Sequence, residues 1–456
     1  MATVTQDLIA SSGEEVIFGL GATGLSCARF LHREGRRFTV IDTRSAPPEL
    51  ATLQREMPDV PVFAGAIPDA IVTRGGEWVV SPGIALEDPV VVRALDAGAE
   101  VVGDIDLFMR AARAPVVGIT GSNAKSTVTA LLGEMAREAG LDVGVGGNLG
   151  TPALDLLAQE RELYVLELSS FQLERAGDLG LAVATVLNVS ADHLDRHGTL
   201  PRYHQAKHRI FRGCRKAVVN RDDPLTLPLL AADVPVISWR LRDPELGGFG
   251  LRVLDGNETL CFGFDPLLPV TELGIKGRHN VANALAAFAL GHAARLSLDA
   301  MVAAARRFSG LPHRCQLVTE AGGIRFVNDS KGTNVGATVA ALEGLASHRN
   351  VVLIAGGVGK GQDFRQLRTA LQAHCKALVL LGEAAAAIED SVADVVSLQH
   401  ATDMADAVAR AAALANHGDV VLLSPACASF DMFSGYPARG DAFVSAVESR
   451  VREDSV

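Results

Sequence analysis

The chain has 456 residues, so its length predicts two to four globular domains. Hydrophobic residues make up 48% and charged residues 21%, which suits folded domains with several buried cores. The net charge of −11, without any run rich in lysine and arginine, argues against a nucleic-acid-binding protein.

The start of the chain and its apolar content give no sign of export or membrane insertion. Met1–Glu15 has neither a basic start nor an apolar core, so we do not expect a signal peptide. No apolar run in the sequence reaches membrane-spanning length. The six cysteines are scattered without a CxxC pair, which is typical of free thiols in a reducing compartment. We therefore expect a cytoplasmic protein.

The N-terminal region alternates short apolar strands with amphipathic helices. Strands are predicted at Val16–Leu20, Phe38–Asp42, Glu77–Val80 and Val101–Val102, with a helix at Thr23–Arg33. Near-continuous apolar runs are typical of parallel strands that helices cover on both faces. The alternation of strand and helix therefore predicts a doubly wound α/β domain.

The first strand leads into a glycine pattern, GxGxxG, formed by Gly19, Gly21 and Gly24. Asp42 ends the next strand, where a dinucleotide-binding domain places an acid on a ribose. One interpretation is therefore an NAD(P)-dependent oxidoreductase. The alternative is a glycine turn that serves only the packing of helix on strand. The pattern makes a diphosphate-bearing ligand plausible without identifying it.

A second loop between strand and helix carries a stronger phosphate signal. The predicted strand Pro115–Thr120 runs into Gly121-Ser-Asn-Ala-Lys-Ser-Thr127. Such a loop directs backbone N–H groups and a helix N-terminus at phosphates, while Lys125 reaches the terminal phosphates. Ala124 and Ile119 occupy the glycine positions of the general nucleotide-loop motif. The alternative is an ordinary turn with an exposed lysine.

Three further segments of the central region carry ionisable side chains. Glu167 ends the strand Leu163–Leu168, where a carboxylate requires a partner such as Mg²⁺ or serves as a helix cap. His193 belongs to a polar cluster after the strand Val183–Val189, where α/β proteins place ligand sites. Lys207 lies in a helical stretch and, taken alone, indicates only a solvated face.

The alternation is interrupted twice before it resumes. Gly250–Phe264 contains an Asp-Gly-Asn turn between apolar runs and predicts a β-hairpin. Phe308–Arg314 carries Gly and Pro and predicts a linker. Domain boundaries and hinge motion are therefore expected near Gly103 and Gly310. Strands follow at Ile324–Asn328, Val351–Ala355, Ala377–Leu381 and Val420–Leu423, and polar loops at Asn328–Asn334, Gly356–Phe364 and Ser424–Asp431.

Several segments, in this order, resemble the Mur ligases of peptidoglycan synthesis, and within them the members that add D-glutamate. The motifs are GSNAKST (121–127), GGNLGTPAL (146–154), YVLELSSFQLE (164–174), LNVSADHLDR (187–196), LPHR (311–314), NDSKGTN (328–334) and SPACASFD (424–431). The resemblance runs from about Val16 to the C-terminus.

The resemblance implies an α/β protein of three domains. Residues 1–103 would form a Rossmann-like domain that binds the UDP moiety. Residues 104–310 would form a P-loop-type ATPase domain with a mostly parallel sheet and a small β-hairpin region. Residues 311–456 would form a Rossmann-like domain that closes over the centre and binds glutamate.

The implied reaction is ATP-dependent joining of D-glutamate to UDP-N-acetylmuramoyl-L-alanine, through an acyl phosphate and a tetrahedral intermediate. ATP, Mg²⁺ in two ions and a carbamylated Lys207 would be required, and we expect a monomer. Alternatives are a ligase of the same fold that adds L-glutamate, a folylpolyglutamate-type enzyme, the oxidoreductase of a different class, and a nucleotide sensor. The presence of Lys125, Glu167 and His193 disfavours the sensor.

The resemblance also assigns residues to sites. The catalytic residues would be Lys125, His193 and Lys207, and the metal ligands Ser126, Glu167, His193 and carbamylated Lys207. ATP would contact Gly121, Ser122, Asn123, Ala124, Lys125, Ser126, Thr127, Asn280, Asn283, Arg314 and Asp329. The UDP-substrate would contact Thr23, Asp42, Thr43, Arg44, Gly83 and Asn148. Glutamate would contact Lys331, Thr333, Lys360, Ser429 and Phe430.

The sequence departs from the family pattern at a few positions. Phe430 stands where leucine is usual, Val358 where aspartate is common, Gly332 where alanine is common and Tyr436 where phenylalanine is common. These changes affect glutamate specificity rather than the class of reaction. Ala124 replaces a loop glycine, at some cost in backbone freedom.

Overall fold

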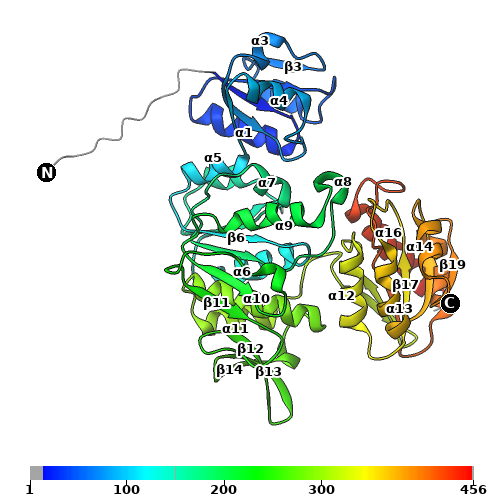
Figure 1. Cartoon of the computed structure of the whole chain (residues 1–456). Helices are drawn as coiled ribbons and strands as arrows, with labels where there is room; N and C mark the ends of the chain where they lie inside the picture. The colour runs from blue at the N-terminus through cyan, green and yellow to red at the C-terminus, as the bar shows by residue number, and fades with distance from the viewer. Residues whose placement is uncertain (1–13, 149, 454–456) are drawn as a thin grey trace.

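The computed structural model describes residues 14–148 and 150–453, which form three α/β lobes in chain order (Figure 1). Residues 1–13 lie outside the described part, so the expectation about a signal peptide in Met1–Glu15 stays a prediction. Each lobe is built on its own sheet, and the strands of all three sheets are mostly parallel. Within the described ranges, none of the helices combines the length and apolar character that a membrane span requires.

The N-terminal sheet is parallel throughout, as its apolar strands predict. Its strands are β1 (Glu15–Phe18), β2 (Phe38–Asp42), β3 (Val62–Ala64), β4 (Gly76–Val80) and β5 (Ala99–Val102), in the order β3-β2-β1-β4-β5. Its helices are α1 (Ala22–Arg33), α2 (Leu50–Glu56), α3 (Asp69–Val72) and α4 (Pro89–Asp96), while α5 (Asp104–Ala111) follows β5 and lies on the central lobe (Figure 1). The strand order reverses between β1 and β4, and such a reversal opens a ligand crevice at the carboxyl ends of the two strands.

Across the central sheet, all neighbouring strands from the β7 edge as far as β12 are parallel, and β13 and β14 then pair antiparallel. Its strands are β6 (Val116–Thr120), β7 (Val143–Gly147), β8 (Leu163–Glu167), β9 (Val183–Val186), β10 (Ala217–Asn220), β11 (Val236–Trp239), β12 (Phe249–Leu254), β13 (Asn257–Phe262) and β14 (Asp265–Pro269), in the order β14-β13-β12-β11-β10-β9-β6-β8-β7. The predicted hairpin is confirmed as β12–β13. Asp255 (φ 50) and Gly256 (φ 79) form its turn with positive φ at both residues, the geometry that two-residue hairpins favour. Strand β14, which extends the hairpin, was not predicted.

The central helices are α6 (Lys125–Glu138), α7 (Ser170–Arg175), α8 (Leu194–His197), α9 (Leu200–His208), α10 (Arg278–Ala293) and α11 (Leu298–Arg307), with short 3₁₀ turns η1 (Ala153–Ala158), η2 (Arg209–Phe211), η3 (Pro224–Thr226) and η4 (Val270–Glu272). Helix α10 is buried around most of its circumference and rich in alanine. Small side chains let it pack closely against α6, which follows the phosphate loop. This packing fixes the start of α6 at the edge of the sheet.

The C-terminal lobe begins after a stretch without helix or strand at residues 308–315, where a linker was predicted. Its strands are β15 (Gln316–Ala321), β16 (Ile324–Asn328), β17 (Val351–Ala355), β18 (Cys375–Leu380), β19 (Ser397–His400) and β20 (Val420–Leu423), in the order β15-β16-β20-β17-β18-β19. Its helices are α12 (Val335–Leu345), α13 (Arg368–His374), α14 (Ala385–Val392), α15 (Met404–Leu414) and α16 (Tyr436–Glu453), with the 3₁₀ turn η5 (Phe364–Leu367). Only β15, which pairs antiparallel with β16, breaks the parallel pattern.

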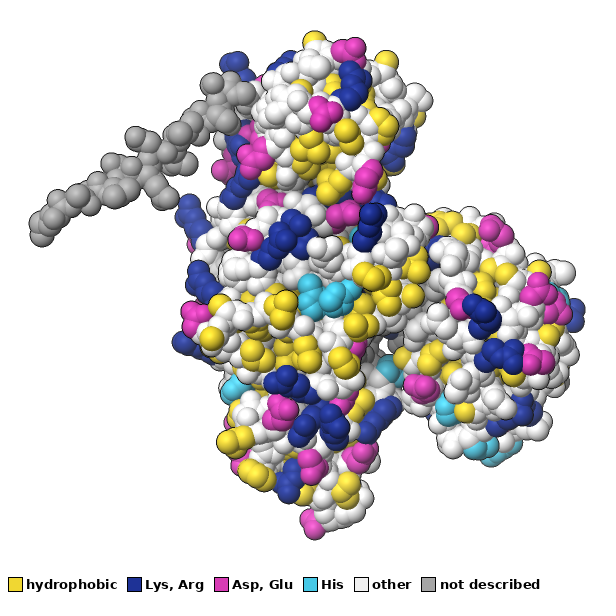
Figure 2. All heavy atoms as spheres, in the orientation of Figure 1, with side chains coloured by type: hydrophobic (Ala, Val, Ile, Leu, Met, Phe, Trp, Pro, Cys, Tyr) yellow, Lys and Arg dark blue, Asp and Glu magenta, His cyan; other side chains and the backbone are white. Residues whose placement is uncertain are grey.

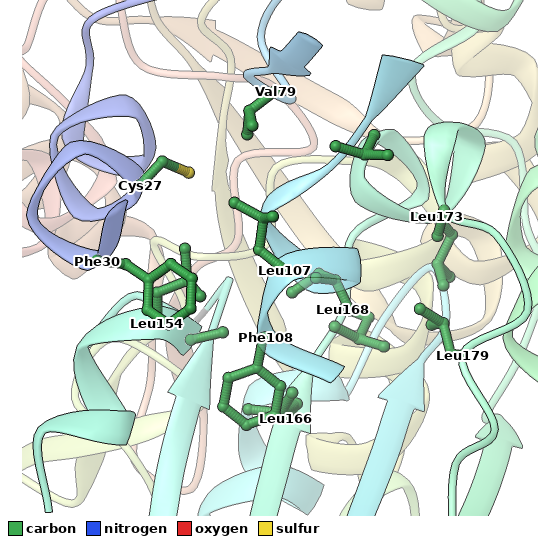
Figure 3. Close-up of a cluster of buried hydrophobic side chains, with 14 of the residues drawn as sticks. Cys27, Phe30, Val79, Leu107, Phe108, Leu154, Leu166, Leu168, Leu173 and Leu179 are labelled. Atoms are coloured by element: carbon green, nitrogen blue, oxygen red, sulfur yellow. The ribbon is translucent and has the colours of Figure 1, made fainter. Parts of the chain in front are cut away.

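The N-terminal and central lobes share one apolar core. In Figure 3, Cys27 and Phe30 of α1 lie near Leu154 of η1, while Phe108 of α5 lies on Leu166 of β8. A large apolar contact between domains opposes their relative motion. The C-terminal lobe instead has separate cores of its own. The boundaries at 103 and 310 stay predictions. Because the shared core opposes motion at the first, the hinge expected near Gly310 has the better physical basis.

Candidate functional site

The glycine turn after β1 is packed against the loop after β4. Gly19 has a φ of 98°, and its carbonyl oxygen accepts a hydrogen bond from Ser81 Oγ at 2.8 Å. A Cβ added to Gly24 would lie 1.9 Å from the same carbonyl oxygen, so only glycine fits there. The pattern GxGxxG therefore serves helix–strand packing here. It also forms one wall of the crevice between β1 and β4.

The residues predicted to contact the UDP-substrate, all but Asn148, come from the carboxyl ends of β1, β2 and β4 or the segments that follow them. The buried carboxylate of Asp42 accepts the backbone N–H of Leu20 at 2.8 Å and a two-armed bond from Arg44. Burial favours the neutral acid, but these bonds outweigh it and hold the pKa of Asp42 below its ordinary value. Asp42 thus fixes the loop that carries exposed Thr43 and Arg44. Thr23 lies in the first turn of α1, and Gly83 is exposed in the loop after β4.

The predicted phosphate loop lies between β6 and α6, as expected. Ala124 stands at the start of α6 with φ 68°, in the left-handed region that favours glycine. The N–H of Asn123 donates to the side-chain oxygen of Asn188 at 2.8 Å. The amine of Lys125 turns back onto the carbonyl oxygens of Gly121 and Ser122, at 2.8 and 3.0 Å.

A buried lysine and a partly buried one share one acceptor in this loop. Lys207 of α9 also donates to the carbonyl oxygen of Gly121, at 2.8 Å, and only 1% of its surface is exposed. Burial and then the charge of Lys125 hold the pKa of Lys207 well below its ordinary value. Burial likewise lowers the pKa of Lys125. A buried lysine with a like charge beside it favours its neutral form, which is the nucleophilic one.

Glu167 ends β8 with one carboxylate oxygen satisfied and one free. Its Oε1 accepts a hydrogen bond from Asn148 Nδ2 at 2.6 Å, while buried Oε2 has no partner among the described residues. Burial opposes ionisation, but Lys125 and neighbouring hydrogen bonds hold its pKa below the ordinary value. An ionised carboxylate with an open, buried oxygen fits Mg²⁺, which binds proteins through a few oxygen ligands.

The described residues contain no group of three or more His, Cys, Asp and Glu side chains placed to hold a metal ion. The predicted ligand set includes only two such residues, Glu167 and His193. His193 follows β9 with φ 52°, and burial lowers its pKa to about 4. The ring is therefore neutral at physiological pH, as metal ligation requires.

Asp192, which the sequence did not single out, joins the central and C-terminal lobes. Its carboxylate accepts hydrogen bonds from Lys360 Nζ at 3.1 Å and from Asn334 Nδ2 at 3.0 Å. Asn334 also donates to Asn123 of the phosphate loop at 3.1 Å. Asn123 and Lys360 were predicted site residues, whereas Asp192 and Asn334 only adjoin predicted ones in the sequence, and that adjacency was their only signal.

Arg314, in the segment that joins the central and C-terminal lobes, contacts the phosphate loop. Its Nη2 donates to Ser126 Oγ at 2.6 Å. A cavity of about 800 Å³ opens beside this contact, and Figure 2 shows a hollow between the two lobes. Predicted residues along its wall are Asn123, Ala124, Thr127, Asn280, Asn283, Arg314, Asp329 and Lys331. All of these except Lys331, which was assigned to glutamate, are residues that the sequence placed in the nucleotide site, and they line one cavity.

The predicted glutamate residues are only partly assembled. Lys331 Nζ lies 4.0 Å from the ring centre of Tyr436, and burial lowers its pKa to about 8. Nearby Asp329, which was assigned to the nucleotide, is buried, which raises its pKa to about 6, and it accepts a hydrogen bond from Ser424 Oγ at 2.7 Å. Ser429 is buried, whereas the side chain of Phe430 is 75% exposed and encloses nothing in this arrangement.

Family models match all three regions of the chain. They are the Mur ligase MurD-like N-terminal domain at residues 13–103, the Mur ligase middle domain at 119–291 and the Mur ligase glutamate ligase domain at 313–427. Together these matches span most of the chain.

Curated relatives are similar along nearly their whole length. The UDP-N-acetylmuramoylalanine--D-glutamate ligases of Pseudomonas fluorescens (strain Pf0-1) and Pseudomonas aeruginosa are each 54% identical over 443 residues, or 97% of this chain and 99% of theirs. Among solved structures, a pseudomurein peptide ligase type C from Methanothermus fervidus superposes with a TM-score of 0.58 at 17% identity, covering 96% of this chain and all of that one. That likeness concerns the fold alone.

Ala124→Gly is expected to raise the free energy of unfolding by about 0.5–1 kcal/mol, because a left-handed backbone strains any residue with a Cβ. Urea unfolding measures the change. Ala136→Gly, inside the same helix, is the matched control and should lower it by about 1 kcal/mol or more. Equal destabilisation by both changes would contradict the strain at Ala124.

His279 should make the protein less stable in mild acid. It borders the cavity, its Nδ1 has no partner among the described residues, and burial lowers its pKa to about 4. The unfolded chain therefore binds a proton at higher pH than the folded one, so stability is intact above about pH 6.5 and falls toward pH 4. Between pH 7 and pH 5 the wild type should lose about 2 kcal/mol more than His279→Gln, by urea unfolding. Equal losses of stability in the two proteins would show that His279 is not the source of the pH dependence.

Proposed function

The chain belongs to the Mur ligase family, and we propose from this premise that it joins D-glutamate to UDP-N-acetylmuramoyl-L-alanine at the expense of ATP. The enzyme class is that of ADP-forming ligases. The observation that carries the proposal is the convergence of cations from two lobes on the phosphate loop and on the carboxylates beyond β8 and β9. Lys125 and Lys207 come from the central lobe, Lys360 from the C-terminal lobe, and Arg314 from the segment that joins the two lobes.

The chemistry explains why cations are needed. The acyl acceptor is a carboxylate, which resists attack by an amine until it is activated. One carboxylate oxygen attacks the γ-phosphorus of ATP, the bond to ADP breaks, and an acyl phosphate results. The glutamate amine then adds to the acyl carbon, and the tetrahedral intermediate expels phosphate as the amine loses a proton. Since two anions meet in the first step, positive charge dominates catalysis.

Lys125 and Arg314 are the proposed contacts of the transferred phosphoryl group. Each now bonds to a group of the phosphate loop, Gly121 O and Ser126 Oγ respectively. These bonds keep both cations satisfied in a buried site and can be exchanged for phosphate oxygens when the nucleotide enters. Asn280, Asn283 and Asp329 are the proposed contacts of the nucleoside, along the same cavity.

Mg²⁺ would be held by Ser126, Glu167, His193 and, if two ions bind, by a carbamate on Lys207. The open Oε2 of Glu167 and the neutral ring of His193 suit this role. When bound, the ions neutralise charge on the phosphates. Carbamylation needs a neutral amine, and burial beside Lys125 favours that form of Lys207.

The two remaining substrates are assigned to the outer lobes. The UDP moiety would lie in the crevice between β1 and β4, against Thr23, Asp42, Thr43, Arg44 and Gly83, with its reacting end near Asn148. Glutamate would lie among Lys331, Thr333, Lys360, Ser429 and Phe430. Of these, Lys360 is paired with Asp192, so glutamate binding would require this pair to open or to share its hydrogen bonds.

We also propose that the enzyme acts in the cytoplasm as a monomer. The six cysteines are free in the described structure, which suits a reducing compartment. One chain supplies every residue assigned above. The oxidoreductase alternative loses its support, because the glycine pattern on which it rested belongs to a region that matches a Mur ligase N-terminal domain.

With ATP, Mg²⁺ and UDP-N-acetylmuramoyl-L-alanine, the enzyme is expected to release phosphate on addition of D-glutamate and not of L-glutamate. The assay is continuous phosphate detection, with Lys125→Ala as the control that should lose at least about 100-fold in rate. Release with L-glutamate alone would change the product, and release with neither would overturn the proposed function.

Lys207 should make activity depend on dissolved CO₂. Removal of bicarbonate is expected to lower the rate, and its return to restore it, because the carbamate forms reversibly on a neutral amine. Lys207→Ala should be inactive at every bicarbonate concentration, whereas Lys216→Ala, remote from the loop, should respond like the wild type. A wild-type rate that ignores bicarbonate would argue against the carbamate.

A further inference from the structure

Arg175, at the end of α7, is a central-lobe residue that extends into the N-terminal lobe. Its guanidinium is buried, with 5% of the residue exposed. Its acceptors are the carbonyl oxygens of Val80 (2.9 Å), Ser81 (2.8 Å), Ile84 (2.9 Å), Phe171 (3.0 Å) and, more weakly, Pro82 (3.4 Å). A buried charge is costly unless its donors are satisfied, and here most of the acceptors come from one loop of another lobe.

That loop, Ser81–Ile84, follows β4 at the reversal of strand order. The backbone N–H of Ser81 donates to Phe18 O at 2.9 Å, and its hydroxyl donates to Gly19 O. A Cβ added to Gly19 would lie 2.8 Å from Ile84 Cδ1, so loop and glycine turn are in tight contact. The loop therefore forms the second wall of the β1–β4 crevice, and Gly83 projects from it.

Helix α7, which carries Arg175, follows directly on the strand that ends at the proposed reaction centre. Helix α7 begins three residues after Glu167, and its first turn is fixed by a capping box between Ser169 and Gln172. Arg196, three residues after His193, donates to the same Ile84 carbonyl oxygen at 2.9 Å and pairs with Glu174 at 3.1 Å. The segments that carry Glu167 and His193 are thus both linked to the crevice loop.

We infer that Arg175 is a positioning residue for the UDP-linked substrate. It fixes the Ser81–Ile84 wall of the crevice to the central lobe, so that a substrate anchored by its UDP moiety presents its far end at a set distance from the phosphate loop. This inference rests on the proposed function. It predicts that Arg175 governs the binding of one substrate only, because its acceptors include no part of the nucleotide cavity or the glutamate loops.

The test compares Arg175→Lys and Arg175→Met in the full-length enzyme. The KM for the UDP-linked substrate should rise at least about tenfold in Arg175→Met and less in Arg175→Lys, which keeps the charge but has fewer donors. The KM values for ATP and D-glutamate should stay within about twofold. The dissociation constant of UDP alone, by calorimetry, should rise in parallel with the first KM.

A merely structural role would give a different pattern. Loss of folded enzyme lowers kcat for every substrate and leaves each KM unchanged. Gly103→Ala is a second variant that keeps the guanidinium: its added Cβ would lie 3.0 Å from Arg175 Cγ and push on the side chain. It should raise the same KM in the same direction, while thermal unfolding verifies that the variants are folded.

Arg439 provides the matched control. It is also a buried arginine that donates to loop carbonyls, but those of Ser330, Gly356, Cys427 and Ala428 in the C-terminal lobe. Arg439→Lys should therefore leave the KM for the UDP-linked substrate unchanged. If the wild type turns over and the Arg175 variants keep that KM, the inference fails alone. If the wild type does not use the UDP-linked substrate, the proposed function fails first.

Discussion

The carboxyl edge of the central sheet imposes the constraint on which the rest depends. Strands β6, β8 and β9 are neighbours and parallel, so the phosphate loop, Glu167 and the Asp192–His193 turn must emerge side by side. Each brings charge into a partly buried place. Charges there persist only when they neutralise one another or have their hydrogen bonds satisfied. The carbonyl oxygen of Gly121, which accepts hydrogen bonds from both Lys125 and Lys207, is the clearest example of such satisfaction.

The C-terminal side of the chain supplies further positive charge to the same edge of the central sheet. Lys360, from a lobe whose apolar cores are its own, bonds to Asp192, and Arg314, from the segment that joins this lobe to the centre, bonds to Ser126. Near the cavity the two bodies therefore meet through polar groups, beside the packing of α10 on α12. Polar contacts can exchange partners for ligand atoms with little net loss, unlike an apolar core, which loses buried area when it opens. The chemistry of the interface suits a lobe that closes around substrates.

The N-terminal lobe is attached in the opposite way. The core in Figure 3 runs from α1 and α5 into η1 and β8, and Arg175 and Arg196 add hydrogen bonds around its edge. The proposed UDP site thus lies on a lobe that an apolar core joins to the centre, whereas the proposed glutamate site lies on the third lobe. This division suits a reaction in which a long nucleotide-linked acceptor is held in place while a small amino acid and ATP enter and leave.

The sequence alone determined the fold class, most parallel strands, the hairpin, the linker and the phosphate loop, because these depend on local periodicity and on residues close together in the chain. It also placed Lys207 on a helix without showing that the amine is buried. The tertiary structure alone decided the contacts of Asp192 with Lys360, of Arg314 with Ser126 and of Arg175 with the loop after β4, which join residues about 90 to 190 positions apart. Burial and partnership at such separations arise only when distant segments pack together, within the central lobe for Lys207 and Glu167, so the depressed pKa of Lys207 and the open oxygen of Glu167 are properties of the folded chain.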